Sequence, residues 1–295
     1  MTARVIDGSS LAGQIRQDTI AKLTRLRESG AVVRLDAILV GDSDAAAIYA
    51  QSQARRCRKV GIDYHLHSLD RSCTNAELQD FIAGLSRDPQ VTGIMLNLPL
   101  PDHLDAPAAQ YTIDPYKDVE GVNPANIGLM FYGTPIIAPC TALAVMFVLR
   151  EIGLDIRGKN TVVIGQGDIV GKPITLGLIG QGATVIACNE YTHRMGDLTR
   201  MADVVIAAAG VPGLVGAEHV KEGAAVIDVG ISRLPGDPQA GTESRVVGDV
   251  RFDEVKDIAS VITPVPGGVG PITVAILLHS AVEAAAKQLA TRRIQ

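Results

Sequence analysis

The fold of this chain is decided by the stretch Thr161-Val-Val-Ile-Gly-Gln-Gly-Asp-Ile-Val-Gly-Lys-Pro173. An apolar strand runs directly into a turn that contains Gly165 and Gly167, and a helix starts near Gly171. Glycines in such a turn let the backbone bend tightly and approach a phosphate, while the free N–H groups of the helix start attract an anion. The spacing is GxGxxxG, one residue longer than the commonest fingerprint. The order of strand, turn and helix therefore predicts a site for a dinucleotide pyrophosphate.

The residues after the turn extend this prediction. A helical segment over 174–182 and a strand over 183–188 complete a right-handed β-α-β unit. Glu190 follows at the place where such folds put the carboxylate that binds the adenosine ribose, although it could also be a solvated loop residue. A carboxylate there repels a 2′-phosphate and the turn contains no Arg, so the electrostatics favour NAD over NADP. Arg194 nearby could still reach a phosphate.

Composition and charge limit the class of protein. The chain has 295 residues, of which 47% are hydrophobic and 20% charged, enough for two compact domains. A formal net charge of -5 and the lack of basic runs argue against nucleic acid as a partner. No apolar run reaches the roughly 18 residues of a membrane span. The first residues lack the layout of a signal peptide, so we expect a cytoplasmic protein without membrane contact.

The cysteines and histidines predict neither a disulfide nor a metal site. The cysteines form no CxxC pair and lie far apart, at Cys57, Cys73, Cys140 and Cys188. His65 and His67 alternate along a predicted strand with no third ligand nearby, so solvent-facing histidines are favoured over metal ligands.

Helix and strand signals alternate along the chain and predict an α/β fold with two domains. In the first half we expect helices over 9–28, 44–60 and 74–85, the last opened by Thr74 with Glu77 in a capping box, and strands over 35–40, 63–68 and 91–96. Residues 97–139 are rich in Pro and Gly and predict an irregular, ligand-binding passage.

The second half predicts a Rossmann-type, doubly wound dinucleotide-binding domain. After a helix over 141–152, strands are expected over 161–164, 183–188, 204–208, 225–229 and 260–263, and a long helix over 272–292 that could pack back on the first domain. Ligands collect at the carboxyl ends of such strands, near Gly210 and Gly230. The predicted boundaries are 1–142 plus 271–295 for the first domain and 143–270 for the second.

Several further segments carry specific residue choices. They are Tyr49-Ala-Gln-Ser-Gln53, Asn97-Leu-Pro-Leu-Pro101, Asp114-Pro-Tyr-Lys-Asp-Val-Glu-Gly121, Pro139-Cys-Thr141 and Thr263-Pro-Val-Pro-Gly-Gly-Val-Gly-Pro-Ile-Thr273. Together with the Gly165 turn, they resemble in order and spacing the methylenetetrahydrofolate dehydrogenase/cyclohydrolase family, over essentially the whole chain. The resemblance implies oxidation of 5,10-methylenetetrahydrofolate to the methenyl cation by hydride transfer to a nicotinamide, and usually hydrolysis to 10-formyltetrahydrofolate in the same cleft.

One position departs from the family pattern in a way that bears on hydrolysis. The family has a Lys four residues after the Tyr, on the same helix face, whereas this chain has Tyr49 and Gln53. An amide cannot gain or lose a proton near neutral pH, and losing proton transfer lowers a rate about 10²- to 10⁴-fold. Hydride transfer needs only the donor carbon and the nicotinamide held close together. Arg55 or Lys117 could replace the missing cation, and Gln53 could also be a harmless variant.

The resemblance also implies the folate contacts. Asn97 stands where the family has Gln, and Glu120 stands where the family has the Asp that recognises the pterin. Asn97 could instead merely end a strand, and Glu120 could be a loop carboxylate. Tyr49 would stack on the folate or simply pack, and the cleft would be shaped by Pro264, Gly267 and Gly268.

The implied dinucleotide contacts form a larger set, which comprises Gly165, Gln166, Gly167, Asp168, Ile169, Val170, Glu190, Ala209, Gly210, Gly230, Ile231 and Thr273. Relatives that use NADP often carry Arg-Ser after the first turn glycine and Ser after the second strand. This chain has Gln166-Gly167 and Glu190, so two substitutions favour NAD.

The leading hypothesis is a soluble, homodimeric, NAD-dependent methylenetetrahydrofolate dehydrogenase with little or no cyclohydrolase activity. Three alternatives stay open. The chain could be a bifunctional enzyme that uses NADP, a non-catalytic folate- or NAD-binding regulator, or an enzyme that acts on a modified pterin carrier.

Overall fold

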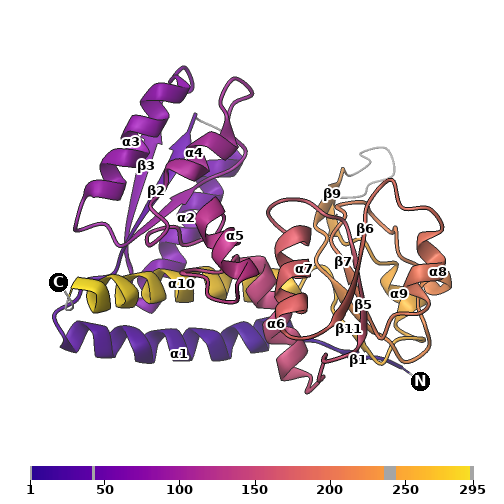
Figure 1. Ribbon diagram of the computed structural model, residues 1–295. Helices are drawn as coiled ribbons and strands as arrows, with labels where there is room; N and C mark the ends of the chain where they lie inside the picture. The colour runs from indigo at the N-terminus through magenta and orange to yellow at the C-terminus, as the bar shows by residue number, and fades with distance from the viewer. Residues whose placement is uncertain (1, 42–43, 236–243, 293–295) are drawn as a thin grey trace. The chain divides into compact units, whose positions relative to one another are not determined.

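The computed structural model describes residues 2–41, 44–235 and 244–292, without the side chains of residues 44–47, 49 and 292. The chain divides into two compact units. Residues 1–12 and 141–274 form one, which we call the large-sheet unit, and residues 13–140 and 275–295 form the other, the small-sheet unit. Both are α/β, as predicted (Figure 1).

The small-sheet unit is built on three parallel strands in the order β3-β2-β4. Strand β2 (Arg34–Val40) lies between β3 (Asp63–Leu69) and β4 (Gly93–Leu96). β4 is fully buried, whereas the residues of β3 are all half-buried or exposed, as expected of an edge strand. The predicted strands are confirmed to within one or two residues at each end.

The helices of this unit cover the sheet and its end. Helix α2 (Asp44–Val60) follows β2, and α3 (Asn75–Arg87) follows β3. The capping box of α3 is confirmed, because the Glu77 backbone N–H donates to Thr74 Oγ1 and the Thr74 N–H donates to Glu77 Oε2 at 2.8 Å. Buried side chains of α3 and of the strands form the core, among them Ile38, Ile82 and Ile94.

Residues 97–139, predicted to be irregular, contain two short helices. They are α4 (Ala106–Thr112) and α5 (Pro124–Phe131). Each has a proline in its first turn and an N-cap side chain, Asp105 or Asn123, that accepts a backbone N–H. The prediction was wrong because a proline breaks a helix interior but is well suited to a helix start.

The longest helices pack together within the small-sheet unit. Thr19 of α1 (Gly8–Glu28) contacts His279 of α10 (Val269–Arg292) at 3.1 Å, and Lys22 forms an ion pair with Glu283. α10, which confirms the long helix predicted over 272–292, is long and apolar enough to cross a membrane by length and composition alone. However, 61% of its most apolar window is buried in the structure, which is typical of the core helix of a soluble protein.

The large-sheet unit contains a six-stranded sheet in the order β1-β11-β8-β7-β5-β6, with all neighbours parallel. Its strands are β1 (Arg4–Val5), β5 (Asn160–Ile164), β6 (Thr184–Cys188), β7 (Val204–Ala207), β8 (Ala225–Asp228) and β11 (Val261–Ile262). The chain runs from β5 outward to β6 and then back across to β7 and β8. This reversal makes the sheet doubly wound, as predicted.

Short helices cover this sheet. α6 (Cys140–Glu151) precedes β5, and α7 (Gly171–Gly180) and α8 (Met195–Thr199) lie on opposite sides of the strands (Figure 1). A 3₁₀ turn (Ala217–His219) and α9 (Phe252–Val255) follow β7 and β10. An antiparallel pair joins β9 (Ser232–Leu234) to β10 (Arg245–Val247). The sequence analysis did not predict strands β1, β9 and β10. The predicted domain boundaries stay a prediction.

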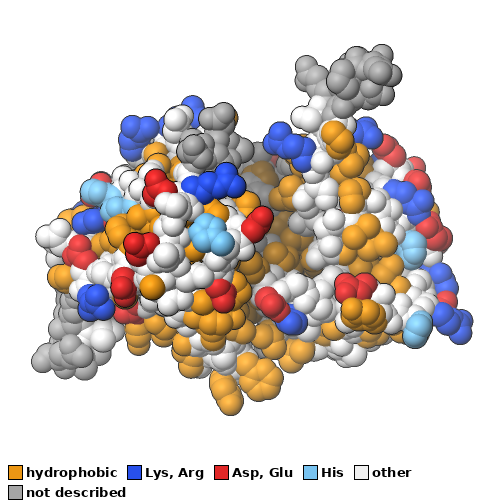
Figure 2. All heavy atoms as spheres, turned by 90° about the horizontal axis from the view of Figure 1, so that it is seen from above, with side chains coloured by type: hydrophobic (Ala, Val, Ile, Leu, Met, Phe, Trp, Pro, Cys, Tyr) orange, Lys and Arg blue, Asp and Glu red, His pale blue; other side chains and the backbone are white. Residues whose placement is uncertain are grey.

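Charges of both signs are interspersed on the face shown in Figure 2, with Lys and Arg beside Asp and Glu over much of that surface. A mixed surface of this kind fits the formal net charge of -5 and lacks the single basic stripe typical of a nucleic-acid-binding face.

Candidate functional site

The glycine-rich turn after β5 requires its glycines. Gly165 has a φ of 92°, and a Cβ there would lie 2.2 Å from the Ala208 carbonyl oxygen. A Cβ on Gly171 would lie 1.9 Å from the Gly165 carbonyl oxygen. By contrast, nothing lies within 4 Å of a Cβ built on Gly167. The turn is therefore packed tightly against its own unit on one side and open on the other, as a phosphate cradle requires.

The helix that follows the turn presents an uncapped N-terminus. The N-cap residue of α7, Val170, offers no side-chain hydrogen bond to the first N–H groups. Gln166 points inward, where its Nε2 donates to the Val163 carbonyl oxygen at 3.2 Å and its Oε1 accepts from Thr175. Asp168 forms a surface ion pair with Lys172. The Lys172 N–H donates to the Gly167 carbonyl oxygen at 3.1 Å and Pro173 has no N–H, so the attraction for an anion comes from the positive end of the helix dipole and the open side of the turn.

The end of β6 carries the predicted ribose-binding carboxylate. Glu190 is exposed beyond the last residue of the strand. Arg194 has a positive φ of 53° and directs its Nε to Asp197 Oδ2 at 2.5 Å. The arginine that could have received a 2′-phosphate is thus paired with a carboxylate.

The turns after β7 and β8 lie beside the glycine-rich turn. A Cβ on Gly165 would come within 2.6 Å of Ala209 Cα, so the turns after β5 and β7 touch. Gly210 has a φ of 70°, and Ile231, which follows Gly230, is 65% exposed. The structure therefore brings most of the predicted dinucleotide residues to one end of the large sheet. Thr273 lies in the first turns of α10, where its hydroxyl donates to the Val269 carbonyl oxygen, and a Cβ on Gly270 of the same helix would lie 3.9 Å from Ile231 Cδ1.

Three substituted positions converge in the small-sheet unit on the end of β4. Gln53 of α2 is buried, and its Nε2 donates to Met95 Sδ at 3.3 Å. Asn97 Nδ2 donates to the Ile38 carbonyl oxygen at 2.9 Å, and its buried Oδ1 has no hydrogen-bond partner among the described residues. The Glu120 carboxylate accepts from the Leu96 backbone N–H. Helix, strand and loop thus place an amide, a second amide and a carboxyl group around residues 95–97.

Glu120 is electrostatically unusual. Burial raises its pKa to about 8, the negative charge of Asp118 adds to the increase, and the Leu96 N–H opposes it. Asp118 is itself buried and accepts from the N–H groups of Gly121 and Asn123 and from Asn126 Nδ2. The neighbouring carboxylate therefore holds the loop in shape, while the pKa of Glu120 stays well above its usual value before a ligand binds.

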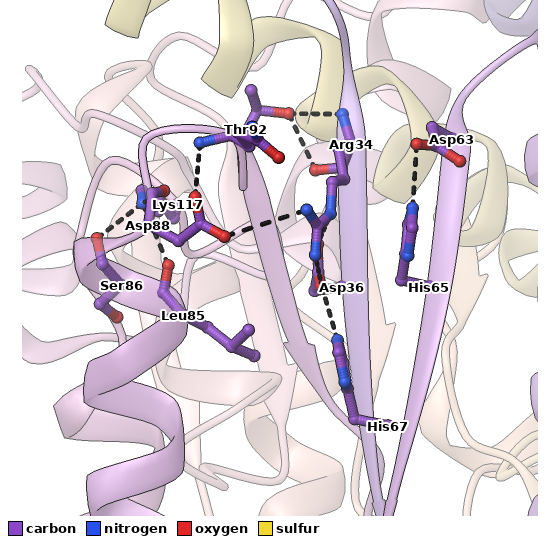
Figure 3. Close-up of polar contacts among 11 residues, drawn as sticks. Arg34, Asp36, Asp63, His65, His67, Leu85, Ser86, Asp88, Thr92 and Lys117 are labelled. Atoms are coloured by element: carbon purple, nitrogen blue, oxygen red, sulfur yellow. Dashed lines mark hydrogen bonds and ion pairs between the residues drawn. The ribbon is translucent and has the colours of Figure 1, made fainter.

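Lys117 closes the end of α3. Its Nζ donates to the carbonyl oxygens of Leu85, Ser86 and Asp88 at 3.1, 2.6 and 2.7 Å (Figure 3). These are among the carbonyls that a helix C-terminus leaves without partners. Lys117 is thus engaged as a buried helix cap, and Arg55 is exposed two residues from buried Gln53. Neither side chain lies beside Gln53 in a described hydrogen bond.

A second polar cluster in this unit went unnoticed in the sequence. Asp36 is fully buried, accepts two hydrogen bonds from Arg34 at 2.8 Å each, and lies 2.6 Å from His67 Nε2 (Figure 3). His65 instead pairs with Asp63 and is exposed. The expectation of two solvent-facing histidines was therefore wrong for His67. The signal was an Asp inside an apolar strand with an Arg two residues earlier.

The remaining predicted folate residues are Tyr49, Pro264, Gly267 and Gly268. The Tyr49 side chain lies outside the described residues, although its place on α2 is one turn before Gln53. Pro264, Gly267 and Gly268 belong to the large-sheet unit, where the Gly267 carbonyl oxygen accepts from the Gly8 N–H. Their contact with folate stays a prediction. Among the described residues, no group of His, Cys, Asp or Glu is placed to hold a metal ion.

Comparison with known proteins gives matches over both units. Residues 6–120 match the catalytic domain of tetrahydrofolate dehydrogenase/cyclohydrolase, and residues 139–289 match its NAD(P)-binding domain. The chain is 41% identical over 283 residues to bifunctional protein FolD 2 of Geobacter metallireducens, which covers 96% of this chain and 97% of that protein.

Solved structures of the same family also match this chain over nearly its whole length. The bifunctional FolD methylenetetrahydrofolate dehydrogenase/cyclohydrolase of Campylobacter jejuni has a TM-score of 0.91 at 40% identity, covering 97% of this chain and 99% of that one. The Trypanosoma brucei enzyme, complexed with NADP and an inhibitor, has a TM-score of 0.90 at 37% identity, covering 98% and 99%.

Proposed function

We propose that this chain, which belongs to the tetrahydrofolate dehydrogenase/cyclohydrolase family, oxidises 5,10-methylenetetrahydrofolate to the 5,10-methenyl compound. The observation that carries the proposal is the convergence of Gln53, Asn97 and Glu120 on the end of β4. The family pattern assigns these three positions to the folate reaction. In this chain all three carry side chains that can hydrogen-bond a folate, but position 53 has Gln in place of the lysine of the pattern.

The dinucleotide supplies the hydride acceptor when it is bound. The residues present fit it: Gly165 and Gly171 allow the tight turn, Gly167 leaves its outer side open, and the start of α7, which has no side-chain cap, turns the positive end of its dipole to the pyrophosphate. The backbone after β7 and β8 would contact the rest of the cofactor through Ala209, Gly210, Gly230 and Ile231. These residues bind and orient, and none of them takes part in proton transfer.

We infer that NAD is preferred over NADP. Glu190 places a negative charge at the end of β6, and the charge of nearby Arg194 is offset by Asp197. Gln166 is turned into the unit, away from the open side of the turn. A 2′-phosphate would therefore meet the Glu190 carboxylate, while Arg194 is directed to Asp197, which also pairs with Arg200.

The cyclohydrolase step is the one that Gln53 should weaken. Water attack on the methenyl cation requires proton transfer, and the Gln53 amide, which donates to Met95 Sδ, can neither accept nor release a proton near pH 7. Lys117 is held by three backbone carbonyls, so it cannot substitute. Hydride transfer is unaffected by this change, and the methenyl compound would leave the protein or be hydrolysed elsewhere.

A fully bifunctional enzyme is the second candidate, and the names of the relatives favour it. The Geobacter metallireducens protein is called bifunctional at 41% identity, and the Trypanosoma brucei structure contains NADP. These names argue for retained cyclohydrolase activity and for NADP. The argument against both comes from residues of this chain, Gln53 and Glu190.

The test is to mix the purified protein with methylenetetrahydrofolate and either NAD or NADP and to follow methenyl absorbance in a non-nucleophilic buffer. Authentic methenyl compound is then added, and its decay is compared with a protein-free control. Turnover with NAD and unaccelerated decay would support the proposal. Accelerated decay, or preference for NADP, would replace it with the bifunctional candidate. Binding without turnover would indicate a regulator, or an enzyme for a modified pterin.

A further inference from the structure

Two buried carboxylates connect the turns at the carboxyl end of the large sheet. Asp228 is the last residue of β8, and Asp249 precedes α9. The exposed fraction of the Asp228 residue is 2%, and that of Asp249 is 0%. Asp228 Oδ1 accepts from the N–H groups of Gly230 and Asp249 at 3.0 and 3.1 Å, and Oδ2 accepts from Val250 at 2.9 Å. Asp228 therefore fixes the segment that carries Asp249.

Asp249 in turn reaches two neighbouring turns. Its Oδ2 accepts from the N–H groups of Ala209 and Gly210 at 2.6 and 2.9 Å, after β7. Its carboxyl group also fills the space beside Gly230, because a Cβ there would lie 2.1 Å from Oδ1. Since the Gly165 turn packs on Ala209, one side chain lies at the centre of three interlocked turns.

A carboxylate at this place is costly for the fold. Asp249 Oδ1 is buried and has no hydrogen-bond partner among the described residues, and burial raises the pKa of Asp249 above its usual value. The same carboxyl group accepts hydrogen bonds from the N–H groups of Ala209 and Gly210 after β7 and packs against Gly230 in the turn after β8. The arrangement organises the turns at a cost to stability, which is a common property of functional sites.

We propose that Asp249 is a positioning residue for the dinucleotide, which sets the backbone of the turns after β7 and β8 without touching the cofactor. The proposal rests on the assignment of these turns to the dinucleotide site made above. Because every contact lies within the large-sheet unit, the effect should fall on dinucleotide affinity and leave the folate site unchanged.

The test is direct calorimetric binding of NAD and of NADP to purified Asp249→Asn and Asp249→Ala. The alanine variant leaves two N–H groups of a binding turn without their acceptor, so we expect the better-bound dinucleotide to bind about 10- to 100-fold more weakly. The asparagine variant keeps a neutral acceptor and should lose less. In turnover, KM for the dinucleotide should rise by the same factor, while kcat and KM for the folate substrate stay within about twofold.

Two further variants separate positioning from loss of stability. Asp203→Asn is the matched control, because Asp203 also accepts a backbone N–H, that of Asn160, but at the opposite end of β5 and β7. It should lower thermal stability and leave dinucleotide affinity unchanged. Gly230→Ala should push the Asp249 carboxyl group away with Asp249 still present. Because Gly230 itself belongs to the proposed cofactor contacts, the positioning role predicts that Gly230→Ala combined with Asp249→Asn binds no more weakly than Gly230→Ala alone. If Asp249→Ala does not fold, Asp249→Asn and Gly230→Ala decide the question.

The outcomes distinguish this inference from the proposed site. Ile231→Glu adds a charge at an exposed position of the turn after β8. If it leaves dinucleotide affinity unchanged, the turn is not part of the site, and the assignment fails together with the inference. If Ile231→Glu weakens binding while folded Asp249 variants and Gly230→Ala bind within about twofold of the parent protein, only the positioning role is refuted. An equal rise in KM for folate and dinucleotide would also refute it.

Discussion

Replacing Glu120 with Gln should abolish a pH dependence of folate affinity. With a pKa of about 8, only about one molecule in 100 carries the charged carboxylate at pH 6, against about nine in ten at pH 9. The edge of a 2-aminopyrimidinone ring offers two N–H donors, which a carboxylate accepts and a protonated acid does not. Affinity should therefore rise as pH increases from 6 to 8 and level off above it. The span is about 100-fold, or about 2.7 kcal/mol.

The assay is anaerobic calorimetry of tetrahydrofolate binding from pH 6 to 9, in buffers that differ in their heat of ionisation. At pH 7 the parent protein should release about 0.9 proton for each folate bound, because most Glu120 side chains begin protonated. Glu120→Gln should release none and show a flat profile. Asp114→Asn, a change in the same loop where the carboxylate accepts the Tyr116 N–H, should retain the slope. A flat profile in the parent, or an unchanged slope in Glu120→Gln, would refute the reasoning.

Three further changes test other parts of the structure. Gln53→Lys should accelerate methenyl decay about 10²- to 10⁴-fold, measured by absorbance, while Gln53→Met leaves it at the parent rate; no gain would show that the lysine alone is insufficient. Lys117→Met should lower the free energy of unfolding, measured in urea, by about 3–5 kcal/mol, because three carbonyl oxygens lose the buried ammonium group that donates to them. Exposed Lys59→Met is the control, and an equally small effect of Lys117→Met would contradict its role as a helix cap. Glu190→Ser should raise the NADP-to-NAD ratio of kcat/KM at least about fivefold, since a unit charge at 4 Å is worth about 1 kcal/mol in water; an unchanged ratio would remove Glu190 from cofactor choice.

Features set by a few neighbouring residues were predictable from the sequence. The Gly165 turn and the Thr74 capping box depend on backbone geometry within a few residues, so their patterns identified them. The prolines of α4 and α5 were also local signals, but they have two meanings. Whether a proline ends a helix or starts one depends on the N-cap before it, here Asp105 and Asn123.

Features that depend on distant residues could not be predicted in this way. Strand β1 exists because Arg4 pairs with Val261, and two residues carry no strand signal of their own. Lys117 and Asp249 look like ordinary charged residues in the sequence, since their partners lie about 30 to 40 residues away. Only the structure shows that both side chains are buried and form hydrogen bonds with backbone groups of other segments. The folate and dinucleotide roles of the site residues stay predictions until the binding experiments are done.

The pairing of the chain's beginning with its end has a consequence for synthesis on the ribosome. β1 needs β11, and α1 contacts α10, so the first 28 residues wait for partners beyond residue 260. Neither unit is complete until residues beyond 260 have left the exit tunnel, and the face of α1 that contacts α10 stays exposed to solvent or to chaperones until then. Such late closure slows folding and lengthens the time during which nascent chains can aggregate. A chain halted near residue 260 should therefore be a substrate for proteases.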